Sequence, residues 1–381
     1  MAVVSRVIFL NNAAGSWPKA PGVAETVKLA LDNPPFHPGR AEGSGTNALD
    51  DCRRALAALL GVTDPGRIVL TSGATHALNI AIGGLGLSND ANVVTTVTEH
   101  NSVLRPLNHL AQHGRVSVSY VGLDENGDLD AAAFDRAMED SPRLVVINHA
   151  SNVTGRVIDA AEFFAKAKAA GAVTLLDASQ SLGLMPVNAP AMNADMVAFT
   201  GHKGLRGPAG TGGLYVSPEI DLEQVIVGGT GVRSDLELHP SDMPMRLEAG
   251  TPNGPAFAGL AHALRWHSRF GELFAREGDR LARKLRHSLA HAHGIRVFDS
   301  GDQAPRTHLV SLGIDGWSVA DAGSVLSESF GIVCRTGLHC APLIHEAIGS
   351  APEGSVRFSV SGANTDDEIE QVVYAVRRLA A

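Results

Sequence analysis

Short apolar runs alternate with helix-like stretches from about residue 67 to residue 217. The helix-like stretches include residues 74–83 and 160–170. This alternation predicts an α/β domain with a mostly parallel seven-stranded sheet and helices on both of its faces. The predicted strands are residues 67–71, 92–96, 115–121, 143–148, 173–177, 195–200 and 212–216.

The pattern changes after this block. Residues 228–255 are rich in Gly, Pro, Arg and Asp, which is typical of a long functional loop. A long helix is expected over residues 256–289, where it could link two domains. Shorter predicted elements follow, and together they favour a smaller α+β domain. They are strands near 295–298, 308–312, 331–335 and 355–359, and a helix over 366–379 that Asn364-Thr365 caps.

Composition narrows the class of protein. A chain of 381 residues exceeds what one hydrophobic core usually supports, so two domains are expected. Its 44% hydrophobic and 19% charged content is that of a globular enzyme, and the net charge of −9 argues against nucleic acid as a partner. No apolar run reaches the length of a membrane span, and the first residues lack the pattern of a signal peptide, so we expect a cytoplasmic protein.

A lysine and an aspartate lie at the ends of two predicted strands. Asp177 ends the strand 173–177, and Lys203 follows the strand 195–200. Desolvation lowers the pKa of a lysine, and a neutral amine can form a Schiff base with an aldehyde. Strand ends are where open α/β sheets bind ligands. Pyridoxal phosphate (PLP) requires a lysine for its aldehyde and a carboxylate for its pyridinium nitrogen, so the pair indicates a PLP enzyme.

Small residues occupy the junction between the first predicted strand and the helix after it. Backbone N–H groups of such a segment can approach a phosphate, and the helix N-terminus adds favourable charge. The same residues also cap helices, so the segment alone is a weak signal. It gains weight from two possible donors that flank the lysine. The candidate phosphate ligands are Ser72, Gly73, Ala74, Thr75, Thr200 and His202.

Two further side chains could contact a cofactor ring. His100 follows another apolar strand, and it is either a capped loop histidine or an aromatic that stacks on the ring and relays protons. Gln180 lies three residues after Asp177 and could reach the phenolic oxygen of the ring.

Three cysteines show no metal-ligand spacing, so no metal site and a reducing compartment are expected. Cys340 lies in a glycine- and proline-flanked loop near Arg335, where a thiol can act as a nucleophile. Cys52 and Cys334 fall in helical and strand-like stretches and are expected to be inert packing residues. Arg357 is either a surface ion-pair partner or a bidentate clamp for a substrate carboxylate.

Taken together, these residues resemble the class V, fold-type I PLP enzymes, specifically the cysteine desulfurase and selenocysteine lyase family. The resemblance covers almost the whole chain, and the Arg-Thr-Gly-x-His-Cys loop is its most distinctive motif. The matching segments are Asn11-Asn12-Ala13-Ala14-Gly15, Thr71-Ser72-Gly73-Ala74-Thr75, Glu99-His100-Asn101-Ser102, residues 148–155, Asp177-Ala178-Ser179-Gln180, Gly201-His202-Lys203, residues 248–253 and residues 335–340.

The resemblance implies roles for these residues. Lys203 would bond the cofactor, Asp177 would hold its pyridine nitrogen, Gln180 its ring oxygen, and His100 would stack on the ring. Thr75, Thr200 and His202 would hold the phosphate, with Thr251 reaching it from a second subunit. The substrate would lie against Asn12, Ala13, Asn152 and Arg357, its carboxylate held by the last two, and Cys340 would take the sulfur.

The chain departs from the family pattern at two places. Leu338-His339 stands where the family often has His-His, and Pro38-Gly39-Arg40 stands for a family His-Arg, which leaves Arg40 a weak candidate. The family implies a large PLP-binding domain of residues 16–262 and a small domain of residues 1–15 and 263–381, which carries the cysteine loop.

We therefore expect a PLP-dependent cysteine desulfurase that converts L-cysteine to L-alanine and carries the sulfur as a persulfide on Cys340. A selenocysteine lyase acting on L-selenocysteine, or another class V aminotransferase, is the alternative. A non-catalytic binding module is a more distant one, against which the combined lysine, aspartate, histidine and cysteine argue. The expected partners are a second copy of the chain and a sulfur-accepting protein, with neither nucleic acid nor membrane.

Overall fold

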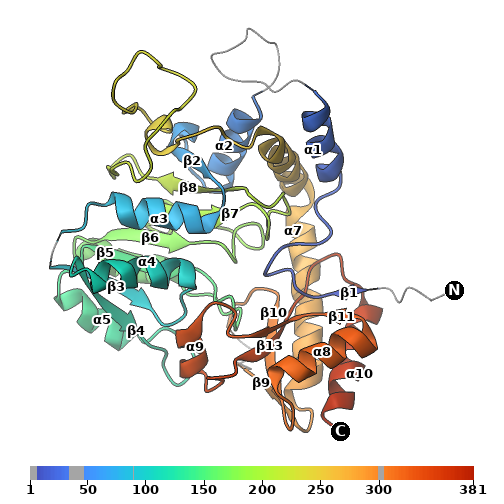
Figure 1. Cartoon of the computed structure of the whole chain (residues 1–381). Helices are drawn as coiled ribbons and strands as arrows, with labels where there is room; N and C mark the ends of the chain where they lie inside the picture. Colours follow the sequence, from blue (N-terminus) through green and yellow to red (C-terminus); the bar gives the residue numbers. More distant parts are fainter. Residues whose placement is uncertain (1–6, 34–46, 89, 299–303) are drawn as a thin grey trace.

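A computed structural model describes residues 7–33, 47–88, 90–298 and 304–381. Its elements form two separate regions joined by one long helix (Figure 1). The strands are β1 (Ile8–Phe9), β2 (Ile68–Thr71), β3 (Ala91–Thr96), β4 (Val116–Val121), β5 (Leu144–Asn148), β6 (Val173–Asp177), β7 (Met196–Thr200), β8 (Gly212–Val216), β9 (Ile295–Val297), β10 (Leu309–Ile314), β11 (Ile332–Val333), β12 (Arg335–Gly337) and β13 (Ser355–Ser359). The helices are α1 (Val23–Asp32), α2 (Ala48–Leu59), α3 (Ala74–Gly84), α4 (Asn101–Gln112), α5 (Ala131–Glu139), α6 (Ala160–Ala169), α7 (Gly254–Ala290), α8 (Val319–Phe330), α9 (Pro342–Ala347) and α10 (Asp366–Leu379), with short 3₁₀ turns at Pro65–Arg67 and Met245–Leu247.

The larger region is a seven-stranded sheet in the order β2-β8-β7-β6-β5-β3-β4. Strand β8 runs antiparallel to both of its neighbours, and the other pairs are parallel. The middle strands β5 and β7 are buried along their whole length, as expected for strands covered by helices on both faces. Two hydrophobic clusters lie on the two faces of this sheet, and the predicted α/β fold is confirmed.

The smaller region is a four-stranded antiparallel sheet in the order β12-β13-β10-β9. Helices α8 and α10 pack on it around a third hydrophobic cluster. The N-terminal strand β1 joins this region through a parallel pair with β11. The chain therefore starts in the region where it also ends (Figure 1).

Helix α7 connects the two regions. The Asn253 side chain accepts a hydrogen bond from the backbone N–H of Ala256 and so caps its N-terminus. Its first turns pack against α1 and α2, and its later turns pack against α10 and β10. The helix is continuous across position 262, so the expected boundary between residues 262 and 263 falls inside one rigid element. No helix within the described ranges is long and apolar enough to cross a membrane.

The strand expected at residues 331–335 is wrong as a single element. Residues 332–333 form β11, which pairs with β1, whereas residues 335–337 form β12, which pairs with β13. Cys334 lies between the two strands. A run of five strand-forming residues cannot show that its two ends join different sheets, because pairing depends on which neighbours the fold supplies.

Candidate active site

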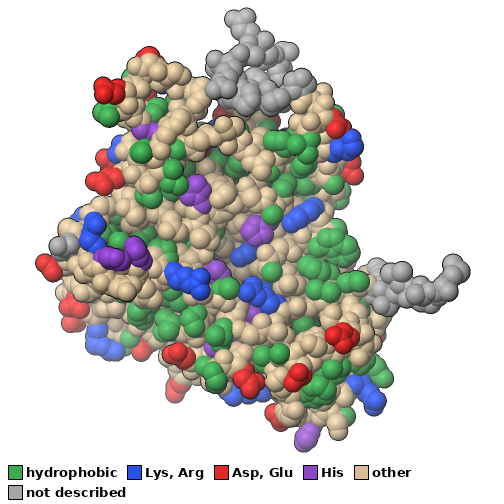
Figure 2. All heavy atoms as spheres, in the orientation of Figure 1, with side chains coloured by type: hydrophobic (Ala, Val, Ile, Leu, Met, Phe, Trp, Pro, Cys, Tyr) green, Lys and Arg blue, Asp and Glu red, His purple; other side chains and the backbone are tan. Residues whose placement is uncertain are grey.

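The site lies at the carboxyl ends of two parallel strands in the middle of the large sheet. Asp177 is the last residue of β6 and pairs with Ala198 of β7, so the carboxylate and the loop after β7 are neighbours. Lys203 lies three residues beyond the end of β7. On the face in Figure 2, Lys, Arg and His side chains gather around the middle of the molecule, where the two regions meet.

Lys203 is held in a state suited to nucleophilic chemistry. Burial lowers its pKa to about 8, while the nearby Asp177 carboxylate acts in the opposite direction. Arg357 and Arg335 are close enough to lower the pKa further. A lysine with this pKa is neutral in a large fraction of molecules at pH 8, which an exposed lysine is not.

Asp177 is buried, and one of its carboxylate oxygens already accepts a hydrogen bond. The backbone N–H of Ser179 donates to its Oδ1 at 2.9 Å. Gln180 is also buried, and its Nε2 donates to the carbonyl of Ala13 at 3.2 Å. This bond brings the N-terminal segment against the loop that follows β6.

A cradle for an anion lies beside them. Gly73 is the N-cap of α3, whose first N–H groups have no partner within the helix. Thr75 lies in the first turn, and its hydroxyl is 2.7 Å from that of Ser102. From the other side, the Thr200 hydroxyl lies 2.7 Å from Nδ1 of His202. A Cβ on Gly73 would lie 3.8 Å from the Thr200 hydroxyl, so the two halves of the cradle face each other.

His100 caps a helix, which is the first of its two expected descriptions. Its Nδ1 accepts a hydrogen bond from the backbone N–H of Ser102 at 3.0 Å and so caps α4. Burial lowers its pKa to about 4, and the nearby Lys203 lowers it further. The imidazole is therefore neutral at pH 7, which suits an aromatic ring that stacks on a cofactor.

These residues fit PLP. The loop after β7 provides an amine with a lowered pKa, β6 provides a carboxylate, and the N-terminus of α3 with Thr200 and His202 provides donors for a phosphate. Among the described residues, no group of three His, Cys, Asp or Glu side chains could hold a metal ion.

Arg357 is the largest fully buried side chain in the described part of the chain. Its Nη1 donates to the carbonyl of Asn152 at 2.8 Å, and its Nη2 lies 3.3 Å from Oδ1 of Asn11. Its Nε and the Oδ1 of Asn152 have no hydrogen-bond partner within the described ranges. Burial and the neighbouring Arg335 lower the pKa of Arg357 to about 9. A buried guanidinium with an unused N–H donor can bind a substrate carboxylate.

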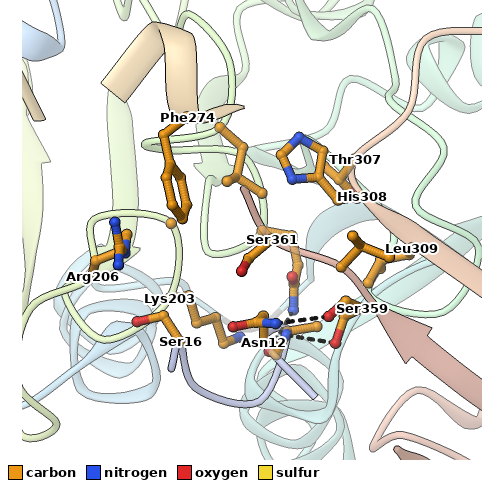
Figure 3. A pocket seen from close by; sticks show the side chains of 15 residues that line it. Asn12, Ser16, Lys203, Arg206, Phe274, Thr307, His308, Leu309, Ser359 and Ser361 are labelled. Atoms are coloured by element: carbon orange, nitrogen blue, oxygen red, sulfur yellow. Dashed lines mark hydrogen bonds between the residues drawn. The ribbon is translucent and has the colours of Figure 1, made fainter. Parts of the chain in front are cut away.

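Asn12 and Ala13 are hydrogen-bonded to Ser359, the last residue of β13. The Asn12 side chain donates to the carbonyl of Ser359 at 2.9 Å, and the Ala13 N–H donates to its hydroxyl at 2.9 Å. Both residues line a cavity between the two regions. Figure 3 shows this cavity with Lys203 and Ser16 on one side and Phe274 and His308 on the other.

The Cys340 loop lies against this site. Nη2 of Arg335 is 3.2 Å from the Cys340 Sγ. The Cys340 carbonyl accepts a hydrogen bond from the N–H of Asn101, the residue after His100, at 2.7 Å. The carbonyl of His339 accepts one from Nδ2 of Asn152, also at 2.7 Å. The loop of the small region is thus fastened to two candidate site segments of the large region.

The other thiols differ from Cys340. The Cys52 Sγ is buried and lies 3.1 Å from the carbonyl of Phe257, and burial raises its pKa to about 12. Burial raises the pKa of Cys334 to about 11. Both are weak nucleophiles at neutral pH, in keeping with a packing role.

Two candidates do not join this group. Thr251 is exposed on the segment between β8 and α7 and does not line the cavity around Lys203. Arg40 lies outside the described residues.

Two residues outside the predicted set of site residues belong to the site. Arg335 contacts the Cys340 thiol. The motif Arg-Thr-Gly-x-His-Cys indicated this residue, because it places a cation five residues before the cysteine. Glu99 is fully buried between the ends of β3 and β5, where its Oε1 accepts hydrogen bonds from Asn148 N and the Thr96 hydroxyl. Burial raises its pKa to about 8. Its position directly before His100 was the only signal for it in the sequence.

The fold and this site define a fold-type I enzyme. The model of the family described as "Aminotransferase class-V" matches residues 34–372, and the chain belongs to that family. The predicted family and fold class are thereby confirmed.

Several similar proteins are named cysteine desulfurases. The chain is 33% identical to a "Probable cysteine desulfurase" of Methanothermobacter thermautotrophicus, over 88% of this chain and 84% of that protein. It is 32% identical to "Cysteine desulfurase IscS" of Pectobacterium carotovorum, over 97% and 92%. Among solved structures, the cysteine desulfurase of Thermococcus onnurineus superposes with a TM-score of 0.89 at 29% identity, covering 98% of this chain and 94% of the other. The predicted kinship with cysteine desulfurases is therefore confirmed.

Proposed function

We propose that this chain is a PLP-dependent cysteine desulfurase, which converts L-cysteine to L-alanine and leaves the sulfur as a persulfide on Cys340. The observation that carries the proposal is the Cys340 thiol. It lies 3.2 Å from the Arg335 guanidinium in a loop fastened to the residue after His100. An aminotransferase needs no thiol at this place, whereas a desulfurase does.

Arg357 and Asn152 bind the substrate carboxylate. The unused Nε of Arg357 and the buried guanidinium charge attract it, and a charge-assisted bond inside the protein is stronger than one at the surface. This fixes one end of the amino acid, so that its amine and its side chain point in defined directions.

Lys203, Asp177 and the cradle of α3 would hold the cofactor, and Gln180 and His100 would contact its ring. When bound, PLP supplies an electron sink for the substrate's Cα. Lys203, with its pKa lowered to about 8, takes the Cα proton and can return it. The Asp177 carboxylate would accept the N–H of the pyridine ring.

Cys340 completes the reaction as the nucleophile. Its sulfur attacks the sulfur of the substrate, a new S–S bond forms, and the substrate's Cβ–S bond breaks. The electron pair of that bond goes to carbon, which takes up a proton to become the methyl group of alanine. Enzyme thiol and cysteine thus give enzyme persulfide and alanine, with no external oxidant. Arg335 stabilises the negative charge on the attacking sulfur.

The test is mass spectrometry and alanine assay after incubation of the PLP-loaded protein with L-cysteine in the absence of reductant. We expect a gain of one sulfur atom, mapped to Cys340, with one alanine released per persulfide. The Cys340→Ala variant should lose both signals and keep the cofactor absorbance, whereas Lys203→Ala should lose that absorbance as well. Alanine release that survives Cys340→Ala would point to a different sulfur acceptor and contradict the proposal.

Two partners belong to this proposal. A persulfide must pass its sulfur to another thiol, and we infer a sulfur-accepting protein for this step. We also infer a homodimer in which Thr251 of one subunit reaches the phosphate site of the other, because Thr251 is exposed on its own chain. Three free cysteines are in keeping with a reducing compartment, and we propose the cytoplasm.

A further inference from the structure

Two consecutive residues of the cysteine loop adopt a backbone conformation that side chains disfavour. His339 has φ 50° and Cys340 has φ 60°, and neither is a glycine. A non-glycine residue in this left-handed region costs about 1–3 kcal/mol and persists only where the surroundings enforce it. The contacts that enforce it here therefore decide where the Cys340 thiol points.

The backbone on either side of the thiol is fastened to the large region. Asn152 holds the carbonyl of His339, and the N–H of Asn101 holds the carbonyl of Cys340, each at 2.7 Å. These two bonds fix the carbonyls. The N–H of Ala341 also donates to the carbonyl of Leu338 at 2.9 Å and closes the turn around His339 and Cys340. The side chain of His339 provides a further anchor for this turn.

That side chain is buried inside the small region. His339 is 2% exposed, and its Nε2 lies 2.9 Å from the hydroxyl of Ser355. Ser355 begins β13, the strand that also carries Arg357, and it is fully buried. The ring of His339 lies 5.5 Å from that of His345, centroid to centroid. The imidazole therefore ties the cysteine loop to the strand that carries the candidate carboxylate clamp.

A role in proton transfer does not fit this imidazole. Burial lowers its pKa to about 2, and the charges of Arg357, His345 and Arg335 act in the same direction. The ring is neutral throughout the physiological range. The hydrogen bond to Ser355 also points the imidazole of His339 into the small region.

We propose that His339 is a positioning residue for Cys340: its bond to Ser355 holds the loop in the left-handed conformation that places the thiol against Arg335. This inference rests on the proposed function, in which Cys340 is the nucleophile. Loss of the bond releases the strained backbone, and the thiol leaves its place beside the guanidinium.

The experiment compares four variants of the PLP-loaded protein. His339→Ala removes the ring, and His339→Asn keeps a polar side chain that tolerates the left-handed region. Ser355→Ala removes only the partner of the ring. His262→Gln is the control, because Nε2 of His262 lies 2.9 Å from the carbonyl of Pro21 in the large region, away from the cysteine loop.

Two rates are measured for each variant. The first is persulfide formation as a function of L-cysteine concentration, which separates kcat from KM. The second is alkylation of Cys340 by iodoacetamide across pH, followed by mass spectrometry without substrate. We expect His339→Ala to lower kcat about tenfold or more with KM little changed, since small misplacements of reacting groups have effects of this size. The alkylation profile of Cys340 should differ from that of the wild type as the contact with Arg335 is lost.

His339→Asn should recover part of kcat, and Ser355→Ala should show a smaller loss in the same direction. Wild-type kcat and an unmoved alkylation profile in His339→Ala overturn the inference. So does an equal loss in His262→Gln, which would indicate a general effect of removing a histidine anchor. If His339→Ala does not fold, Ser355→Ala decides, and wild-type behaviour there counts against the proposal. A wild-type chain that forms no persulfide refutes the proposed function, while the alkylation profiles still test the role of His339.

Discussion

At the scale of single residues, burial sets the chemistry of this protein more than pairing does. It brings the pKa of Lys203 down to about 8 and takes those of Cys52 and Cys334 up to about 12 and 11. Desolvation favours the uncharged form of any group. It therefore makes the amine of Lys203 more nucleophilic and the thiols of Cys52 and Cys334 less reactive. Cys340 differs from these two thiols in lying 3.2 Å from the guanidinium of Arg335.

The buried histidines predict a loss of stability in acid. Burial lowers the pKa of His149 and His308 to about 4 and that of His339 to about 2, against about 6.5 in the unfolded chain. Below pH 6.5 the unfolded chain binds protons that the folded chain does not, so the stabilisation present above this pH is lost as the pH falls. Glu99, with its raised pKa, acts in the opposite direction and offsets about one histidine.

We expect each of these histidines to lower the free energy of unfolding by about 1.5 kcal/mol between pH 6.5 and pH 5, since each pKa unit corresponds to about 1.4 kcal/mol. Urea unfolding at a series of pH values measures this fall. His308→Gln should flatten the slope, because it removes one of the buried histidines that titrate. A stability that is level or rises toward pH 5 would count against these assignments.

At the scale of elements, close backbone approach ties the sheet to the phosphate cradle. A Cβ on Gly212, the first residue of β8, would lie 2.6 Å from the carbonyl of Phe199 and 2.6 Å from the Cα of Gly73. Gly73 is the N-cap of α3. The absence of a side chain at Gly212 therefore lets β7, β8 and the N-terminus of α3 meet.

Gly212→Ala should disturb both stability and cofactor binding. The backbone atoms around it cannot rotate away, so we expect about 1–3 kcal/mol of lost stability together with weaker retention of PLP. Gly122→Ala is the control, because a Cβ there meets nothing within 4 Å, and its effect should stay within about 0.5 kcal/mol. Denaturant unfolding and cofactor absorbance after dialysis measure the two effects. Equal results for the two variants would refute the role of the close approach.

At the scale of the whole molecule, the two regions are coupled at two places. Helix α7 runs through both, and the cysteine loop of the small region is fastened to Asn101 and Asn152 of the large one. The candidate site therefore depends on how these regions sit against each other. One exposed segment remains outside this arrangement. Between β8 and α7 it carries Thr251 and the exposed apolar side chains Val225, Ile226, Val227, Leu236 and Leu238.

A second copy of the chain is expected to cover this segment. Light scattering of the purified protein should give twice the mass of one chain, because exposed apolar side chains in this number favour association. Thr251→Ala should weaken PLP retention without changing that mass. A monomer that holds PLP as tightly as the wild type would contradict both the dimer and the role of Thr251.

Much of the large region follows from the sequence. The seven strands were predicted within one or two residues, because strands buried on both faces read as short apolar runs between helix-like stretches. The strands of the small region were harder to predict from the sequence. They are short, and the run at residues 331–335 splits between two sheets, since local strand propensity does not specify a partner.

The sequence by itself determined that Asp177 and Lys203 lie at one edge of one sheet, because the carboxyl ends of parallel strands converge. It also determined which cysteine sits in a loop. Only the tertiary structure decided that Arg335 contacts the Cys340 thiol, that Glu99 is buried between two strand ends, and that His339 turns into the small region. These contacts join residues far apart in the chain, and they depend on packing between regions that no local pattern records.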